Sequence, residues 1–146
     1  PEYHDENPLQ ATMEIDLDGA IKSINQAEKN GVKRFVMVGA SHSDDRSYWG
    51  KVDGMKPYYT AKHYADLELK RSSLDYTILR PVLLTDEDEA GKVLMTENPD
   101  EVGSEIPRQA VAETVLAVLK DPKTYGKVIE MSKGEDTIAD ALAKVC

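Results

Sequence analysis

The apolar run Phe35-Val36-Met37-Val38, which lies between Gly31 and Gly39, decides the fold. A short run without polar alternation is typical of a strand buried on both faces in a parallel sheet. Apolar residues recur at helical spacing before this run, and Asn30-Gly31 gives that helix a stop. The apolar residues of the expected helix are Leu17, Ala20, Ile21, Ile24 and Ala27. The sequence therefore predicts a helix followed by a buried strand.

The same alternation continues toward the C-terminus. Pro57 opens a helix, residues 75–80 form the next strand and Pro81 ends it, because proline cannot donate to a central ladder. A third helix over 111–119, a third strand over 127–131 and a closing helix over 137–145, capped by Asp136 or Thr137, follow. This order predicts an α/β fold, the C-terminal part of a doubly wound parallel sheet of Rossmann-like type, as a single domain over 1–146.

Two segments have no clear periodicity. Residues 39–56 are rich in Ser, Asp and Gly and are expected to form a loop. Residues 82–105 are acidic, with one possible short strand at 92–95, and a loop of that length usually has a function. The second segment is the expected substrate loop.

Composition restricts the class of partner. The chain of 146 residues carries a formal charge of −9, which argues against binding nucleic acid or an anionic membrane through a basic surface. Small-molecule partners are expected instead. The acidic run Asp86-Glu87-Asp88-Glu89 has no His or Cys companion and is interpreted as a solvated charge run, so no metal is expected.

Cysteine use and hydropathy indicate the compartment. Cys146 is the only cysteine, so there is no disulfide framework and no cysteine metal site. No apolar run approaches the about 18 residues of a membrane span, and no signal-peptide pattern opens the chain. We therefore expect a cytoplasmic protein.

Tyr58 and Lys62 are the strongest candidates for chemistry. Their spacing of four residues places a phenol and an ammonium one helical turn apart on one face. A nearby ammonium favours the phenolate, so Lys62 is expected to lower the pKa of Tyr58 toward the range in which an acid or base is efficient. Ser41 and Pro81-Val82 follow two expected strands and belong at the carboxyl edge of the sheet, where such folds bind ligands.

Five segments taken in order resemble an atypical short-chain dehydrogenase/reductase, of the NAD(P)-binding and NAD-dependent epimerase/dehydratase-like group. They are Asp16-Leu17-Asp18-Gly19-Ala20, Gly31 to Val38, Tyr58 to Lys62 with Ala65-Asp66, Leu74 to Pro81, and Ile106 to Ala112. The resemblance implies an NAD or NADP cofactor and makes Tyr58 the acid/base on a small carbonyl, hydroxyl or sugar-nucleotide substrate. It also implies that Lys62 binds the nicotinamide ribose and that Pro81 and Val82 line the nicotinamide end of the site.

The same resemblance implies that Ser41 polarises the substrate oxygen. From the residues alone, Ser41 could equally be a turn serine or a helix cap. His42 and His63 are interpreted as solvated histidines. Tyr48 and Trp49 could either wall a substrate pocket or bury in a dimer contact.

The glycine-rich G-x-x-G-x-x-G turn that cradles a pyrophosphate is not found in this sequence. The resemblance then implies that roughly 70 residues of two preceding βαβ units are absent. The 35–38 strand would expose an apolar edge unless a homo-oligomer partner, another polypeptide or a missing N-terminal segment covers it. We expect this chain alone to bind NAD(P) weakly or not at all, and the choice between NAD and NADP stays open.

Two other functions remain compatible with these residues. One is a non-catalytic NAD(P)-binding redox sensor, which would need no proton donor such as Tyr58. The other is an inactive truncated fragment.

Overall fold

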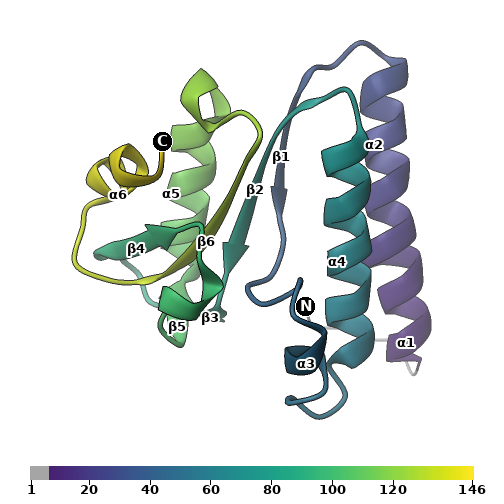
Figure 1. The fold of residues 1–146 in the computed structure, drawn as a ribbon, viewed down its shortest axis with the longest axis horizontal. Coiled ribbons are helices and arrows are strands. Elements are labelled where there is room, and N and C mark those ends of the chain that lie inside the picture. Colours follow the sequence, from purple (N-terminus) through teal and green to yellow (C-terminus); the bar gives the residue numbers. More distant parts are fainter. Residues whose placement is uncertain (1–6) are drawn as a thin grey trace. The chain divides into compact units, whose positions relative to one another are not determined.

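The computed structural model describes residues 7–146, and helices and strands alternate along them (Figure 1). The chain divides into two compact units. Unit 1 comprises Pro1–Lys33 and His42–Leu74, of which 7–33 and 42–74 are described, and unit 2 comprises Arg34–Ser41 and Asp75–Cys146.

Unit 1 is helical in its described residues. A continuous helical segment begins with α1 (Pro8–Ala11), passes through a π-helix η1 (Thr12–Gly19) and ends with α2 (Ala20–Lys29). The short helix α3 (Arg46–Trp49) and the long helix α4 (Lys56–Arg71) follow, and α4 packs against both η1 and α2. The helix that the sequence predicts is therefore present, but its first half is π-helical.

Gly19 ends the π-helix η1 at a position where there is little room for a side chain. A Cβ added to Gly19 would lie 3.3 Å from the carbonyl oxygen of Glu14, five residues earlier. That separation is tighter than ordinary carbon–oxygen contact, so glycine is the residue that this turn accommodates most easily. At the other end of the segment, Gly31 has a φ of 74° and ends the helix, as the sequence predicts.

Unit 2 contains the sheet. Its four strands lie in the order β1 (Arg34–Val38), β2 (Asp75–Pro81), β6 (Lys127–Lys133) and β4 (Val93–Thr96). The first three are parallel, with Val38 opposite Leu79 and Leu79 opposite Ile129, and β4 runs antiparallel to β6. A separate parallel pair joins β3 (Leu83–Thr85) to β5 (Glu105–Pro107). The prediction of an α/β fold with a parallel sheet is confirmed, and β4 is an antiparallel addition.

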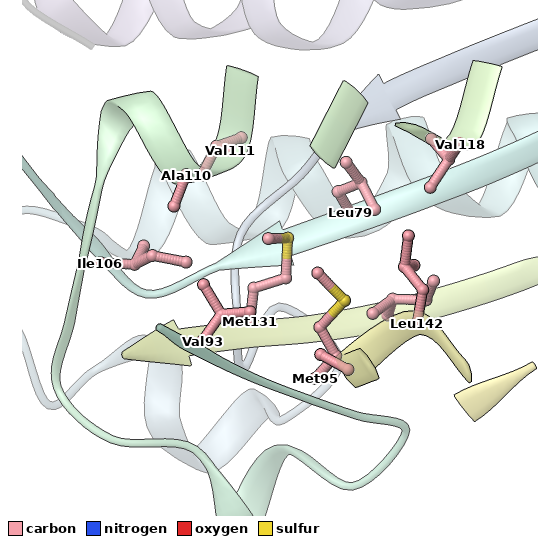
Figure 2. Close-up of a cluster of buried hydrophobic side chains, with 11 residues drawn as sticks. Leu79, Val93, Met95, Ile106, Ala110, Val111, Val118, Met131 and Leu142 are labelled. Carbon is pink, nitrogen blue, oxygen red and sulfur yellow. The ribbon is translucent and has the colours of Figure 1, made fainter. Parts of the chain in front are cut away.

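The core of unit 2 lies between this sheet and two helices, α5 (Arg108–Leu119) and α6 (Ile138–Val145). Figure 2 shows its buried side chains, which come from both the strands and the helices. They are Leu79, Val93, Met95, Ile106, Ala110, Val111, Val118, Ile129, Met131, Ala141 and Leu142. Thr137, rather than Asp136, caps α6, because its side chain accepts a hydrogen bond of 3.2 Å from the backbone of Asp140.

The two segments without periodicity contain more structure than expected. Residues 39–56 include α3, whose N-terminus is capped by the Asp45 carboxylate through the backbone N–H groups of Ser47 and Tyr48. Residues 82–105 hold β3, β4 and a single 3-10 turn, η2 (Pro99–Glu101). The strand expected at 92–95 is confirmed as β4, displaced by one residue. A second 3-10 turn, η3 (Pro122–Thr124), precedes β6.

None of the helices in residues 7–146 is both long and apolar enough to cross a bilayer.

Candidate active site

Tyr58 and Lys62 lie on one face of α4, in its first two turns, as their spacing predicts. Pro57 sits near the N-terminus of this helix, where its missing N–H costs no hydrogen bond. The Lys62 Nζ atom is 5.6 Å from the centroid of the Tyr58 ring, which is within the range of a cation–π contact. Both side chains are half-buried. The pair therefore forms within unit 1.

The electrostatics of Tyr58 differ from the prediction. Burial, and after it the charges of Asp16, Tyr59 and Asp66, raise the pKa of Tyr58 to about 12. The expectation that this pKa is lowered is wrong for the chain as described, because desolvation and the neighbouring negative charges both favour the neutral phenol. The Tyr58 hydroxyl consequently keeps its proton at neutral pH, the state needed by a proton donor.

Asp16 is the residue that sequence reasoning missed. It lies in η1, which packs against α4, and its carboxylate interacts electrostatically with both Tyr58 and Lys62. Burial raises the pKa of Asp16, while the charge of Lys62 opposes that rise. Its Oδ2 atom is buried without a hydrogen-bond partner among the described residues. Asp16 does begin one of the five segments that resemble the family, but no sequence pattern assigned it a role beside Tyr58.

Ser41 and Pro81 meet in unit 2, at the carboxyl ends of β1 and β2. The Ser41 backbone N–H donates a 3.0 Å hydrogen bond to the Pro81 carbonyl, and the Val82 N–H donates one of 3.1 Å to Met131. The Ser41 side chain is buried, and its hydroxyl has no partner in the described residues. The structure therefore brings Ser41 beside Pro81-Val82 in one unit, and Tyr58 beside Lys62 and Asp16 in the other.

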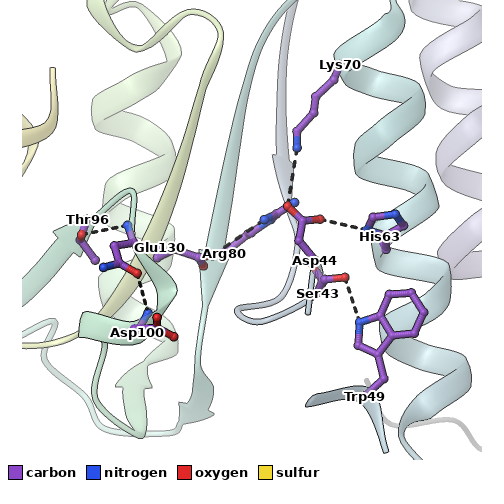
Figure 3. A network of polar contacts seen from close by, with 10 residues as sticks. Ser43, Asp44, Trp49, His63, Lys70, Arg80, Thr96, Asp100 and Glu130 are labelled. Atoms are coloured by element: carbon purple, nitrogen blue, oxygen red, sulfur yellow. Dashed lines mark hydrogen bonds and ion pairs between the residues drawn. The ribbon is translucent and has the colours of Figure 1, made fainter. Parts of the chain in front are cut away.

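The histidine nearest to Tyr58 in sequence is not solvated as expected. The His63 side chain is 15% exposed, and its Nδ1 atom lies 2.9 Å from the Asp44 carboxylate (Figure 3). The rings of Trp49 and Tyr64 pack against it at centroid distances of 5.5 and 5.0 Å. His63 on α4 therefore packs between the rings of Trp49 and Tyr64. The sequence alone does not reveal this contact, because it does not show which residues lie near a single histidine in the fold.

Trp49 is buried inside unit 1. It is 5% exposed, and its indole N–H donates a 2.9 Å hydrogen bond to the Ser43 carbonyl (Figure 3). Of the two uses considered for Trp49, a wall of an open substrate pocket does not fit this burial. Tyr48 and His42 are half-exposed, and their rings stack at 4.3 Å.

The acidic run in unit 2 is partly paired. Arg108 lies 2.8 Å from Asp86, and Lys133 lies 2.7 Å from Glu87 and 3.0 Å from Glu105. The loop over 87–92, with Pro107, Lys133 and Gly134, lines an open hollow of about 590 Å³. Among residues 7–146, no group of three or more His, Cys, Asp or Glu side chains is placed to hold a metal ion.

Each unit thus holds its own set of polar groups. In unit 1, Tyr58 and Lys62 offer a hydroxyl and an ammonium from one helix face. In unit 2, Ser41 offers a buried hydroxyl without a partner among the described residues.

A family model and the sequences of individual relatives both indicate one family for this chain. A family model described as NAD(P)H-binding matches residues 6–122. The chain is 41% identical over 134 residues to the uncharacterized sugar epimerase YhfK of Bacillus subtilis, and this match covers 92% of the chain and 61% of that protein. It is 36% identical to the UPF0659 protein YMR090W of Saccharomyces cerevisiae, with 88% and 58% covered.

Solved structures agree on the fold. A putative NAD-dependent epimerase/dehydratase from Bacillus halodurans matches with a TM-score of 0.89 and 39% identity, over 96% of this chain and 64% of that one. The oxidoreductase ylbE from Lactococcus lactis matches with a TM-score of 0.85 and 35% identity, over 97% and 64%. The chain thus spans about three fifths of the length of the relatives it matches. Because the family model and these relatives match most of the chain, and because the parallel sheet and the Tyr58–Lys62 helix agree with them, the chain belongs to the family of NAD(P)H-binding proteins with a Rossmann-like fold, whose cofactor is NAD or NADP.

Proposed function

We propose that the protein containing this chain is an NAD(P)H-dependent reductase of small carbonyl compounds, with Tyr58 as the proton donor. The observation that carries the proposal is the geometry of the pair: Tyr58 and Lys62 lie one turn apart on α4, with the Lys62 Nζ atom 5.6 Å from the Tyr58 ring. The Tyr58 phenol carries its proton at neutral pH, so it can deliver that proton to a developing alkoxide, and the ammonium can stabilise the phenolate that remains. The names of the relatives, an oxidoreductase and two epimerases, agree with hydride chemistry of this kind.

The bound nicotinamide would supply the hydride to the carbonyl carbon. Tyr58 would then give its hydroxyl proton to the carbonyl oxygen, which completes the alcohol. Lys62 would stabilise the phenolate that Tyr58 becomes, since its ammonium lies 5.6 Å from the ring. The role of Ser41 as a donor to the substrate oxygen rests on the family resemblance and on its hydroxyl without a partner.

The test is the oxidation of NADH and NADPH by a full-length protein that contains this chain, against quinones, aldehydes and sugar nucleotides. Tyr58→Phe should lower kcat by about 100-fold or more, as expected for loss of a general acid. Tyr64→Phe is the matched control, because Tyr64 lies on the same helix and is 43% exposed. Unchanged turnover in Tyr58→Phe would refute the role of Tyr58. Bound cofactor without turnover of any compound would favour the redox sensor.

A further inference from the structure

Four aromatic rings form a continuous row in unit 1 that begins at Tyr58. Tyr58 contacts Tyr59 at a centroid distance of 5.6 Å, Tyr59 contacts Tyr48 at 5.4 Å, and Tyr48 stacks on His42 at 4.3 Å. All four side chains are half-exposed, so the row is open to a ligand over part of its length. We name these four residues the aromatic row.

The aromatic row is held in place by contacts on its outer side. The Asp45 carboxylate caps α3 and so orients Tyr48, while Trp49, next to Tyr48, is anchored by its hydrogen bond to Ser43. His63 on α4 binds Asp44 at 2.9 Å, which ties the loop to the helix (Figure 3). His42 adopts a φ of 65°, a conformation that is uncommon for a residue with a side chain. These contacts fix the position of the half-exposed Tyr48 ring, which indicates that the ring has a role in binding.

The rings of the aromatic row present both faces and edges. Tyr59 meets Tyr58 and Tyr48 at interplanar angles of 65° and 81°, whereas Tyr48 and His42 stack at 22°. These contacts offer a ligand aromatic surface. A sugar needs several free donors and acceptors, whereas a flat conjugated ring needs faces and edges of other rings.

Two cations lie along the same row. The Nζ atom of Lys51 is 5.9 Å from the Tyr48 centroid, and that of Lys62 is 5.6 Å from the Tyr58 centroid. Each ammonium lies close enough to a ring of the row to donate to a carbonyl oxygen of a ligand on that ring. A conjugated ring that carries carbonyl oxygens therefore matches both the aromatic surface and these donors.

We infer that the aromatic row is a substrate-binding surface and that the preferred substrates are planar, ring-conjugated carbonyl compounds rather than sugars. The inference rests on the proposed function, because it takes Tyr58 as the group that meets the substrate oxygen. Tyr48 is then a specificity-determining residue, and it lies two rings away from Tyr58 along the row.

The experiment compares two 1,2-diones with the same reacting group, planar 9,10-phenanthrenequinone and aliphatic butane-2,3-dione. In the full-length protein, Tyr48→Leu should lower the ratio of kcat/KM for the planar dione to that for the aliphatic one by about three- to tenfold, the loss of one ring contact. Tyr48→Phe keeps the ring and should preserve the ratio. Tyr64→Leu, outside the row on the same helix, should leave it unchanged.

Binding of phenanthrenequinone, measured by saturation-transfer NMR, separates this inference from the proposed function. Weaker binding in Tyr48→Leu than in Tyr48→Phe supports the aromatic row even if no carbonyl compound is reduced. Turnover with an unchanged ratio in Tyr48→Leu overturns the aromatic row and leaves the reductase standing. A ratio that falls equally in Tyr48→Phe, or in Tyr64→Leu, also overturns it, because ring contact with Tyr48 would not be the cause.

Discussion

Asp16 shows how a residue far away in the sequence sets the chemistry of Tyr58. The two are 42 positions apart in the sequence, and the packing of η1 on α4 brings the Asp16 carboxylate within electrostatic range of the Tyr58 hydroxyl. The Asp16 carboxylate disfavours the Tyr58 phenolate and at the same time interacts favourably with the Lys62 ammonium. It therefore opposes the effect that Lys62 was expected to have on Tyr58.

Replacing Asp16 by Asn should lower the pKa of Tyr58. The sign follows from charge: a neighbouring negative group stabilises the neutral phenol, so removing it favours the phenolate and moves the titration to lower pH. The measurement is the tyrosinate absorbance near 295 nm. Subtracting Tyr58→Phe from the parent isolates Tyr58, and the same subtraction is made in the Asp16→Asn background.

In the parent chain this difference titration should have its midpoint near pH 12, with Tyr58 protonated throughout the neutral range. A midpoint below 10 in the parent would mean that Lys62 outweighs burial, as the sequence alone suggested. A midpoint that stays in place in Asp16→Asn would show that the Asp16 charge does not contribute to the shift.

The sequence predicted least about the surroundings of individual residues. The spacing of Tyr58 and Lys62 was enough to place both on one helix face. The sign of the shift in the Tyr58 pKa was not predictable, because it depends on burial and on Asp16, and periodicity reports neither. The environment of His63 was hidden in the same way, since Asp44 comes from a loop without a pattern.

At the scale of elements, a buried ion pair joins the two central strands of unit 2. Arg80 of β2 lies opposite Glu130 of β6, and their side chains, 4% and 3% exposed, approach to 3.8 Å (Figure 3). Removing one member of a buried pair leaves the other charge in a low-dielectric interior. Such losses destabilise proteins strongly, whereas exposed pairs contribute little.

Glu130→Ala should therefore reduce the free energy of unfolding by about 3–5 kcal/mol, measured by urea denaturation. The matched control is Asp86→Ala, which removes the exposed partner of Arg108 and should cost less than about 1 kcal/mol. Equal losses for the two variants would mean that the Arg80–Glu130 pair is no more important than a surface contact.

Strands with long apolar runs were predictable, and short elements were not. The expected strands at 35–38, 75–80 and 127–131 agree with β1, β2 and β6 to within two residues at each end. The helix α3 has four residues and depends on the Asp45 cap, while β3 and β5 have three residues each. Periodicity needs more residues than these elements have. The π-helical turns of η1 were not predictable, because only Leu17 of the five apolar residues that predict the helix lies in η1 and the other four lie in α2.

At the scale of the whole molecule, the 146-residue chain holds the residues that we propose for the nicotinamide end of a cofactor, and its sequence has no glycine-rich turn for a pyrophosphate. We expect this chain by itself to bind NADH and NADPH only weakly, because phosphate contacts supply much of the affinity for a dinucleotide. Isothermal titration calorimetry on the chain should give no saturable heat in the micromolar range. Micromolar binding would show that the described residues hold the whole dinucleotide.

The outer edge of β1 raises the question of what covers it in the whole protein. β1 is the terminal strand in the order of the four-stranded sheet, and Val38 at its end is 37% exposed. That a second copy, another polypeptide or a further segment covers this edge stays a prediction. Sedimentation of the chain over a range of concentrations would test it, since an uncovered apolar edge promotes association.

The way the chain passes between its two units has a consequence for folding. Residues 34–41 belong to unit 2, although they lie between two segments of unit 1, so the backbone changes unit three times, after Lys33, Ser41 and Leu74. No single truncation can yield one unit complete and free of residues of the other: a cut after Leu74, for example, keeps all of unit 1 together with the 34–41 segment of unit 2. The parallel pairing of β1 with β2 must also close a connection that contains α3 and α4 before it gains any stability. Neither unit is thus encoded as a continuous piece, and a cut in the 39–56 segment would divide both at once.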